Sequence, residues 1–468
     1  MPTRSNVPAG SRGDEIETQL RSALQAVERA PLPGARDLAI IAGFDSRGNP
    51  LRHMENLVIE TATLLAKSGH IYGYGDTIVM ESQRLDGSGP DLVPLRTGPI
   101  IERGAEHFLA NHFLCGGAAA PITPPRKFVE TLLRSDHIRK KLPRIKTYAR
   151  RPIFDLEFNL CSHGFTRQTG VLVHGFPIEA VDESPGSLDL PPIDRLPVHL
   201  RTLLRGFCLF SAADLVNTVG ILLTVMLIHH FIDDGKPVLL IDANQPAIGK
   251  TLLAIVIGIL LDGRPPRLTQ FTMDDDELQK RMCATLRDQS QSLLLLDNAK
   301  TRGGQVLSSQ TIEANSLAPM ISLRILGQSA NFTRPNDCIW AVTMNDTRAS
   351  PDLVSRGLPI QLYFEGNPAE RNFTGCNPVE YALAHRRELF GELAGMIMRW
   401  NQLGRPHGCA QHRCGHWAAI VGGILEAANL PDLLRNAATA AAAFDSSLEE
   451  LAALAEAVVN GSGPFTEI

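Results

Sequence analysis

The spacing of apolar residues divides the chain into a first part with mixed periods and a second part with short continuous apolar runs. Four of these runs, at residues 238–241, 268–271, 293–296 and 339–343, are flanked by Gly-containing turns and helical patterns. Apolar runs that alternate with helices are typical of strands buried on both faces of a mostly parallel sheet. The second part of the chain is therefore predicted to be an α/β domain.

The first part combines helical and β-like patterns. Apolar residues at helical spacing predict a helix within residues 11–30, a second from 54 to 65 and a third around 128–133. The β-like runs 71–74 and 77–80 are joined by Gly75-Asp76, a pair that suits a hairpin turn. Residues 154–160 alternate apolar and polar side chains, which predicts a half-buried strand. We therefore expect a mixed α+β domain over residues 1–182.

A segment rich in Pro, Gly and Ser, residues 183–197, predicts a linker between the two parts. It separates the N-terminal domain from a core expected over 198–365 and a helical C-terminal region expected over 366–468. Within the core, Ser211 and Asp214 form a capping-box pattern before a short apolar run. A membrane span needs roughly 20 apolar residues, so this run predicts a buried helix and no membrane partner. Helical patterns in the C-terminal region lie at residues 379–400, 417–429 and 437–459.

Composition adds few constraints. The 468 residues are 44% hydrophobic and 20% charged, an ordinary globular balance that can bury a large core. A formal net charge of −5 does not exclude nucleic acid, because a local basic surface is what binds phosphates. The eight cysteines are scattered and follow no signal peptide, so we expect reduced thiols in a cytoplasmic protein.

Candidate chemistry follows the first buried run directly. A segment ending in Gly249-Lys250-Thr251 stands between that run and an apolar helix. A phosphate-binding loop (P-loop) needs this order, because N–H groups at a helix N-terminus cradle phosphates, a lysine reaches the β- and γ-phosphates, and a hydroxyl binds Mg²⁺. Asn244 replaces the motif's first glycine, and asparagine tolerates left-handed backbone. The alternative is an ordinary helix start in an unrelated α/β domain. The candidate nucleotide-binding residues are Asn244, Gln245, Pro246, Ala247, Ile248, Gly249, Lys250 and Thr251.

Two later runs end in polar residues that fit the same site. The third run ends in Asp297, which is placed to hold Mg²⁺ together with Thr251. Asn345 follows the fourth run, where an amide can orient an attacking water. Arg356, further on, is either an arginine finger or half of a structural salt bridge. The sequence therefore predicts an ATP and Mg²⁺ site with Lys250, Asp297, Asn345 and Arg356 as catalytic residues.

Four segments carry further motifs in a fixed order. Residues 277–281 (ELQKR) and 324–329 (RILGQS) are followed by 335–345 (PNDCIWAVTMN) and 352–362 (DLVSRGLPIQL). They resemble the segments ELRKR, RILGxS, PNxxxWxATGN and DLxxRxxPIxL of the AAA+ ATPase module in phage, plasmid and integrative-element proteins. That module is often fused to primase or TOPRIM domains and is related to viral replicative helicases. The chain departs from it at Asn244 and at Met344, which replaces a frequent glycine.

The resemblance implies a P-loop AAA+ core in a homo-oligomeric ring, expected to be a hexamer, that acts on single-stranded or forked DNA. It also implies a hairpin into the ring channel, here residues 327–337, with Arg334 as a basic residue at the hairpin tip and a candidate DNA contact. A solvated arginine on an ordinary β-turn is the alternative for Arg334. Since the sequence has no recognisable primase or TOPRIM domain, a primase or DNA-binding subunit is expected to be separate.

One residue of many such motors is missing. A glutamate often follows the Mg²⁺-binding aspartate and activates water, but here Asn298 follows Asp297, and an amide cannot accept that proton. The second buried run leads into the acidic segment 274–277, so Glu277 is a candidate base at a neighbouring strand end. The alternative is a helix N-terminus enriched in acids because of the helix dipole.

Five potential zinc ligands lie close together near the C-terminus. Thiolates with imidazoles suit tetrahedral zinc, but the spacing matches no standard zinc finger. An ordinary loop is the preferred interpretation and a zinc site the alternative. The five residues are His407, Cys409, His412, Cys414 and His416.

Three functions stay open at this point. The first is a DNA helicase, or helicase-like ATPase, of a mobile genetic element. The second is a ring-forming defence or protein-remodelling ATPase. The third is a nucleotide-gated assembly protein with weak hydrolysis, which Asn244 and Asn298 support because both depart from the usual motifs. ATP turnover stimulated by DNA separates the first function from the others, and measurable turnover of any kind excludes a non-enzymatic protein.

Overall fold

The computed structural model describes residues 39–41, 44, 47, 49–50, 52–83, 90–95, 113–115, 124–288, 291–300, 306–327, 330–344, 349–370, 375–438 and 455–456. The chain forms two compact units. Unit 1 comprises Met1–Lys67 and Arg96–Lys141, and unit 2 comprises Ser68–Leu95 and Leu142–Ile468. The expected N-terminal domain of residues 1–182 therefore contributes to both units, because its later strands pair and pack within unit 2.

Unit 1 is described mainly by helices. The helices α2 (Met54–Lys67) and α4 (Arg126–Leu133) confirm two of the sequence predictions, and α5 (Asp136–Lys141) packs against α2. The short strands β1 (Ala39–Ile41) and β5 (Phe113–Cys115) pair in parallel. The helix predicted within residues 11–30 lies outside the described residues.

Unit 2 is built on a five-stranded parallel sheet, as the apolar runs predict. Its order is β13-β14-β17-β12-β18, so β12, the strand before the candidate P-loop, lies between β17 and β18. The four predicted strands are all present, and β18 was not identified from the sequence. The strands are β12 (Val238–Ala243), β13 (Leu268–Gln270), β14 (Leu293–Ala299), β17 (Ile339–Met344) and β18 (Gly357–Leu362).

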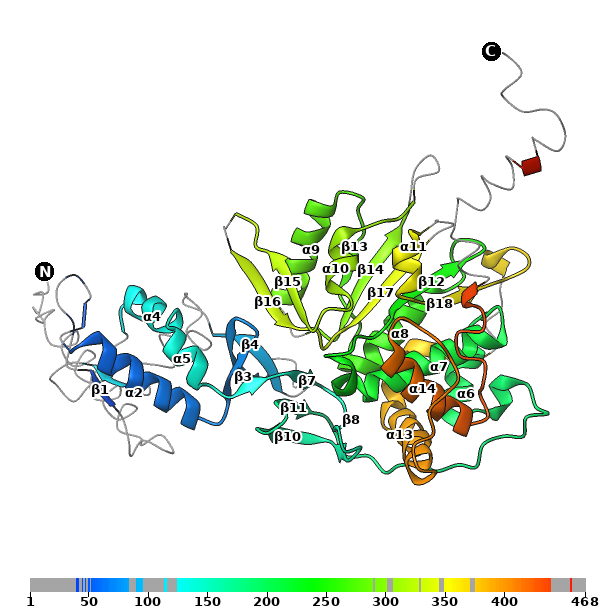
Figure 1. Ribbon diagram of the computed structural model, residues 1–468, viewed down its shortest axis with the longest axis horizontal. Helices are drawn as coiled ribbons and strands as arrows, with labels where there is room; N and C mark the ends of the chain where they lie inside the picture. The colour runs from blue at the N-terminus through cyan, green and yellow to red at the C-terminus, as the bar shows by residue number, and fades with distance from the viewer. Residues whose placement is uncertain are drawn as a thin grey trace, which may run out of the picture. The chain divides into compact units, whose positions relative to one another are not determined.

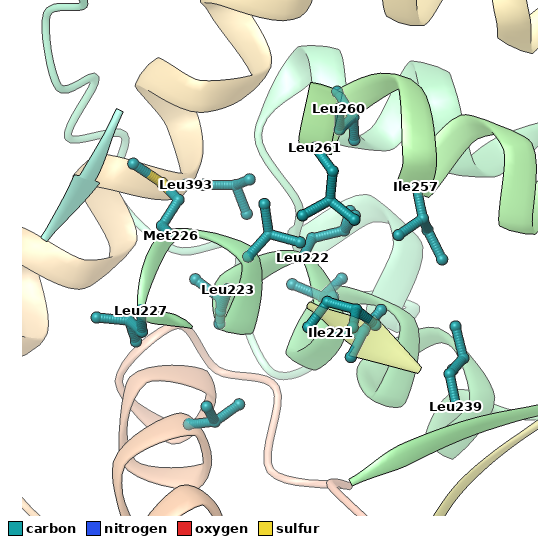
Figure 2. Close-up of a cluster of buried hydrophobic side chains, with 14 of the residues drawn as sticks. Ile221, Leu222, Leu223, Met226, Leu227, Leu239, Ile257, Leu260, Leu261 and Leu393 are labelled. Carbon is teal, nitrogen blue, oxygen red and sulfur yellow. The ribbon is translucent and has the colours of Figure 1, made fainter. Parts of the chain in front are cut away.

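Successive residues of the central strands face two different apolar cores, which explains their continuous hydrophobicity. Leu239 and Ile241 of β12 pack into the core with the long helices shown in Figure 2, whereas Leu240 packs into the opposite core. The helices of the first core are α6 (Val198–Arg205), α7 (Ala212–Met226), α8 (Lys250–Asp262), α12 (Pro378–Ala384), α13 (Arg386–Gln402) and α14 (Gly415–Ala427). The second face carries α9 (Asp275–Asp288), α10 (Gln310–Asn315), α11 (Pro351–Ser355), β15 (Met320–Arg324) and β16 (Asn331–Pro335), as Figure 1 shows.

The C-terminal helices share the first core with α7 and α8. The pattern predicted as one helix over 379–400 is broken at His385, where α12 ends and α13 begins. The helix predicted over 437–459 falls largely outside the described residues. Ser211 and Asp214 form the predicted capping box, and α7 behind them is buried. Within the described part of the chain, every helix is too short or too polar to cross a bilayer.

Smaller strands complete unit 2. The hairpin predicted at Gly75-Asp76 is present, since β2 (Ile71–Tyr74) pairs antiparallel with β3 (Thr77–Gln83). The alternating segment at 154–160 is not a single strand, and that prediction is wrong. Asp155 Oδ1 accepts hydrogen bonds from the Glu157 and Asn159 N–H groups, which turns the chain between the short strands β8 (Ile153–Phe154) and β9 (Leu160–Cys161). The remaining strands are β4 (Pro90–Pro94), β6 (Arg144–Ile145), β7 (Thr147–Ala149), β8 (Ile153–Phe154), β9 (Leu160–Cys161), β10 (His163–Thr166) and β11 (Val171–His174).

The predicted linker at 183–197 is an ordered strap along the C-terminal helices. It contains one short 3-10 turn, Pro192–Arg195, and a second such turn, Ile228–Phe231, follows α7. Arg195 donates to the Asn429 carbonyl at 2.9 Å. A Cβ on Gly395 of α13 would lie 1.9 Å from the Val181 carbonyl oxygen, so α13 needs glycine where the chain passes it just before the strap. The last short turn is Pro368–Glu370.

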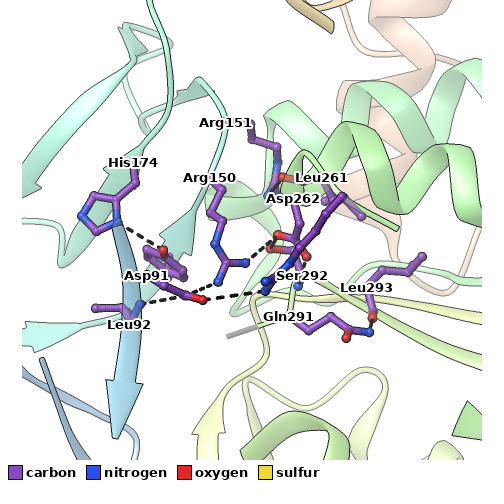
Figure 3. Close-up of polar contacts among 12 residues, drawn as sticks. Asp91, Leu92, Arg150, Arg151, His174, Leu261, Asp262, Gln291, Ser292 and Leu293 are labelled. Carbon is purple, nitrogen blue, oxygen red and sulfur yellow. Dashed lines mark hydrogen bonds and ion pairs between the residues drawn. The ribbon is translucent and has the colours of Figure 1, made fainter. Parts of the chain in front are cut away.

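A buried polar network fixes the far end of α8, away from the candidate P-loop (Figure 3). Asp262, the last residue of α8, accepts bonds from the N–H and hydroxyl of Ser292 at 2.8 and 2.6 Å. A carboxylate is unfavourable at a helix C-terminus. Arg150 offsets that cost, because it pairs with both Asp262 and Asp91. The network therefore ties α8 to the start of β14 and to β4.

Candidate functional site

The candidate site lies at the carboxyl ends of β12, β14 and β17. The chain leaving β12 enters α8 on one face of the sheet, whereas α11, which follows β17, buries Leu353 on the other. Where neighbouring strands send their connections to opposite faces, a crevice opens at the carboxyl edge. The fold therefore places the predicted phosphate loop where α/β proteins bind ligands.

The loop at 244–249 has left-handed backbone at two positions. The φ angles are 63° at Ala247 and 111° at Gly249, the residue that caps α8. Successive N–H groups in such a turn form a concave anion-binding nest at the positive end of a helix. Among the residues that the structure describes, a Cβ built on Gly249 would meet a single ring carbon of Phe207, at 4.0 Å, so their atoms leave that side of the loop open. This geometry is consistent with a phosphate cradle.

Asn244 has a different role from the one expected. It is not among the residues with positive φ, so the replaced glycine is not needed for left-handed backbone here. Its side-chain amide instead donates to the Phe364 carbonyl at 3.0 Å and accepts from the Phe364 N–H at 3.1 Å. Gln245 Nε2 donates to the same carbonyl at 2.6 Å and to that of Gly366 at 3.0 Å. These bonds tie the start of the loop to the segment after β18.

Asp297 is held by two hydroxyl groups. Thr251 Oγ1, in the first turn of α8, donates to Asp297 Oδ1 at 2.9 Å. Thr343 Oγ1, near the end of β17, donates to the same oxygen at 2.7 Å. The structure thus unites Thr251 and Asp297, which the sequence predicted as Mg²⁺ ligands, and adds Thr343. Within the sequence, the only signal for Thr343 is a hydroxyl in an otherwise apolar strand.

Lys250 is largely enclosed, with 8% of its surface exposed. Burial lowers the pKa of its ammonium group, and the nearby carboxylates of Asp242 and Asp297 oppose this shift. Asp242, near the end of β12, was not identified from the sequence. It also lines a cavity of about 430 Å³ beside the start of α7. A bound polyphosphate would supply the negative charge that a buried ammonium requires.

The donor atoms fit Mg²⁺. A carboxylate and a hydroxyl are hard oxygen ligands, and Mg²⁺ is commonly bound by one or two carboxylates together with substrate phosphates and water. Asp297 and Thr251 already converge at the mouth of the loop. Asn345, the residue expected to orient water, lies outside the described residues.

The acids expected to supply a base have partners of their own. Glu277 pairs with Arg281 at 3.0 Å and approaches Lys280 at 3.8 Å, all on α9. Asp274 Oδ1 accepts from the Glu277 N–H at 3.1 Å, which caps the start of that helix. Asp275 accepts from Thr311 at the start of α10. These contacts favour the interpretation that the segment 274–277 serves the helix start.

Arg356 is engaged within its own chain. Its Nη2 lies 2.5 Å from Asp352 Oδ2, and its side chain is 11% exposed. Asp352 also pairs with Arg413 at 2.8 Å. The arrangement matches the structural salt bridge that the sequence left as an alternative to an arginine finger.

Arg334 is not at a hairpin tip, and this expectation is corrected. It lies in β16, opposite Ile321 of β15, toward the base of the hairpin. Its side chain is 2% exposed, pairs with Asp337 at 2.5 Å and stacks over the Tyr74 ring. An arginine buried in this way cannot meet a nucleic-acid backbone. Arg324, by contrast, is exposed near the turn and lines a hollow with Lys280 of α9.

The cysteine–histidine segment does not gather ligands. His412 accepts the Cys414 N–H at Nδ1, at 3.0 Å, and its Nε2 lies 3.2 Å from the Gly357 carbonyl. A carbonyl can only accept, so Nε2 carries the hydrogen and both ring nitrogens are used. Burial raises the pKa of the Cys414 thiol to about 11, which disfavours the thiolate that zinc needs. Among the described residues, no group of three potential ligands is arranged for a metal ion.

Comparisons with known proteins give distant similarity only. No protein-family model and no curated protein matches the chain. The apo A form of the NrS-1 C-terminal region is similar over 78% of this chain and 73% of that one, with 12% identity and a TM-score of 0.38. The X-ray structure of JCV helicase is similar over 47% of this chain and 58% of that one, with 17% identity and a TM-score of 0.28. Similarity at this level leaves the function to be argued from the site itself.

Proposed function

We propose that the chain binds ATP with Mg²⁺ at the loop 244–251 and hydrolyses it. The observation that carries the proposal is the convergence of the Thr251 and Thr343 hydroxyls on Asp297 Oδ1, beside a left-handed loop and the enclosed Lys250. An ordinary helix start needs neither a buried ammonium nor a second strand that orients a carboxylate. The shared chemistry of these groups is recognition of a metal-bound polyphosphate.

The residues have distinct roles in this proposal. The N–H groups of the loop and the first turn of α8 bind phosphate oxygens, and Lys250 neutralises charge on the β- and γ-phosphates. Thr251 and Asp297 hold Mg²⁺, which neutralises charge that develops during phosphoryl transfer. Because Lys250 is largely buried, its ammonium charge interacts with a bound anion through a lower effective dielectric than in water, and the attraction is stronger.

No general base is assigned. Asn298 cannot accept a proton, and Glu277 is paired with Arg281. General-base catalysis typically contributes ~10²–10⁴-fold in rate, so we expect turnover to be slow compared with motors that carry a glutamate after the aspartate. Slow ATP hydrolysis by the chain alone is what we expect of an ATPase whose turnover is stimulated by a bound partner.

We further propose that the motor acts on DNA as a helicase-like ATPase in an oligomeric ring. The resemblance of residues 277–281 and 324–362 to the AAA+ module supports this proposal. The hollow between α9 and the β15–β16 hairpin has a volume of about 380 Å³, and its charged lining residues are Lys280, Arg324 and Asp276. Its two basic side chains are the favoured phosphate contact in place of Arg334. A defence or remodelling ATPase is the competing function, and DNA-independent turnover would favour it.

The test is nucleotide binding and ATP turnover by Lys250→Ala, measured with and without forked DNA. We expect turnover to fall to background while the thermal unfolding temperature stays close to the parent value, because the ammonium acts on bound phosphates. Lys236→Ala is a contrasting control, since Lys236 is also buried but bonds to Asn336 at 2.6 Å, away from the loop. It should lose stability. A folded Lys250→Ala chain with normal turnover would refute the site.

A further inference from the structure

A β-bulge positions the candidate metal-binding carboxylate. The pairing of β14 with β17 shifts register between Leu296 and Ala299, so Asp297 and Asn298 occupy an irregular step. Asn298 has a φ of 60°, in the left-handed region. Bulges next to functional sites re-aim a side chain that regular pleating would point elsewhere. The polar residue on the partner strand at this step is Thr343, which is 1% exposed.

The hydrogen bonds around the bulge form a chain of fixed direction. The Asn298 N–H donates to Thr343 Oγ1 at 2.9 Å, so that hydroxyl cannot point its hydrogen back at the amide. Its hydrogen is directed to Asp297 Oδ1, at 2.7 Å. Thr251 donates to the same oxygen at 2.9 Å. Both hydroxyls therefore engage Oδ1, and neither uses Oδ2.

We infer that Thr343 is a positioning residue for Asp297 and that Asn298 is present for its backbone conformation, not as a degenerate catalytic acid. The inference rests on the proposed function, because it assigns these residues to the Mg²⁺ site. Residues that orient a metal ligand through hydrogen bonds are second in importance only to the ligands themselves. Thr343 orients Asp297 in this way through its hydroxyl hydrogen.

The bulge also explains the absent glutamate in physical terms. A left-handed φ favours glycine, asparagine and aspartate, and other side chains adopt it at a cost. A glutamate at 298 would strain the step that aims Asp297. The Asn298→Glu chain is therefore expected to lose Mg²⁺ affinity and not to gain turnover.

The decisive experiment compares Thr343→Val with Thr343→Ser. The valine variant keeps the shape of the side chain and removes the hydroxyl, whereas the serine variant keeps the hydroxyl. For each chain, the affinity for a fluorescent ATP analogue is measured as Mg²⁺ is raised from zero. Loss of an orienting contact typically costs ~10–100-fold in metal affinity. The Thr343→Val chain should therefore need at least ~10-fold more Mg²⁺ than the parent for the same increase in affinity for the analogue. Thr343→Ser should stay within a few-fold of the parent.

Affinity for the analogue without Mg²⁺ should be unchanged in both variants, since the loop itself is intact. A second measurement needs no ligand: amide hydrogen exchange across 293–300 should accelerate in the valine variant, because the Asn298 N–H loses its acceptor. An unchanged Mg²⁺ requirement in a folded Thr343→Val chain overturns the inference and leaves the proposed function standing. A parent chain that binds no nucleotide, with or without Mg²⁺, overturns the proposed function and the inference with it.

Discussion

Gly75 offers a quantitative test of how the N-terminal hairpin of unit 2 is fixed to the central domain. The residue has a φ of 63°, and a Cβ placed on it would lie 1.9 Å from the Thr333 carbonyl oxygen. The hairpin turn docks there, since the Asp76 N–H donates to that oxygen at 3.2 Å. Next to the turn, the Tyr74 hydroxyl lies 2.7 and 2.6 Å from the two oxygens of Asp337. Gly75→Ala must therefore displace the turn.

The expected loss of stability has three parts. Left-handed backbone costs an alanine about 1–2 kcal/mol whatever surrounds it. Forcing a methyl group against fixed backbone costs typically about 1–3 kcal/mol, and a broken buried hydrogen bond to a charged group about 1.5–3 kcal/mol. If these contributions add, we expect Gly75→Ala to lower the free energy of unfolding by about 3.5–8 kcal/mol.

Gly69→Ala is the matched control. Gly69 lies just before the same hairpin with a φ of 79°, and a Cβ on it would meet nothing within 4 Å. It should lose only the backbone part, about 1–2 kcal/mol. Urea unfolding followed by fluorescence and by circular dichroism measures both variants. Equal losses in the two variants would refute the docking argument, because then only backbone conformation matters.

Three further predictions concern charged groups. Glu277→Gln should hydrolyse ATP within a few-fold of the parent, because Glu277 serves its own helix; a fall of ~10²–10⁴ in rate, measured with normal ATP binding, would identify it as the base instead. Arg356→Ala should lower the free energy of unfolding by about 1–3 kcal/mol, because Asp352 loses a largely buried partner. Recovered turnover on mixing that variant with an inactive P-loop lysine variant would instead assign an arginine finger acting across subunits. Burial lowers the pKa of His229 and of His230 to about 4, from 6.5, so the folded chain holds both neutral. Above pH 6.5 both histidines are neutral in the folded and unfolded chains, and they leave the free energy of unfolding unchanged with pH. As the pH falls from 6.5 toward 4, the unfolded chain takes up protons that the folded chain does not, and each histidine lowers the free energy of unfolding by about 1.4 kcal/mol per pH unit. His230→Phe should therefore make the free energy of unfolding, measured in urea, fall less steeply over this pH range.

The sequence by itself determined the features that depend on neighbours along the chain. The capping box at Ser211 and the turn at Gly75 involve residues a few positions apart, so local pattern suffices to find them. The buried strands could also be found, because strands covered on both faces are continuously apolar. The candidate site around Lys250 could be located because its strand, loop and helix follow one another directly in the sequence.

Predictions from the local sequence pattern were wrong in two situations. In one, a side chain bonds to nearby backbone and turns the chain. In the other, the register between two paired strands decides whether a side chain is exposed. Residues 154–160 alternate like a strand, yet Asp155 bonds to two following N–H groups and turns the chain. Arg334 was expected at a hairpin tip, but the pairing of β15 with β16 sets Arg334 opposite Ile321, toward the base of the hairpin, and buries it against Asp337. A shift of hairpin register moves a residue between tip and base, and sequence spacing does not fix it.

The tertiary structure alone decided which groups meet at the site. Thr343 and Asp297 are 46 residues apart, and their contact exists because β17 pairs with β14 across a bulge. Asp242 comes near Lys250 because β12 and the start of α8 meet at the same edge of the sheet. Such contacts depend on the order of strands and on how far one strand slides along another, and many distant residues set both through the cores they share.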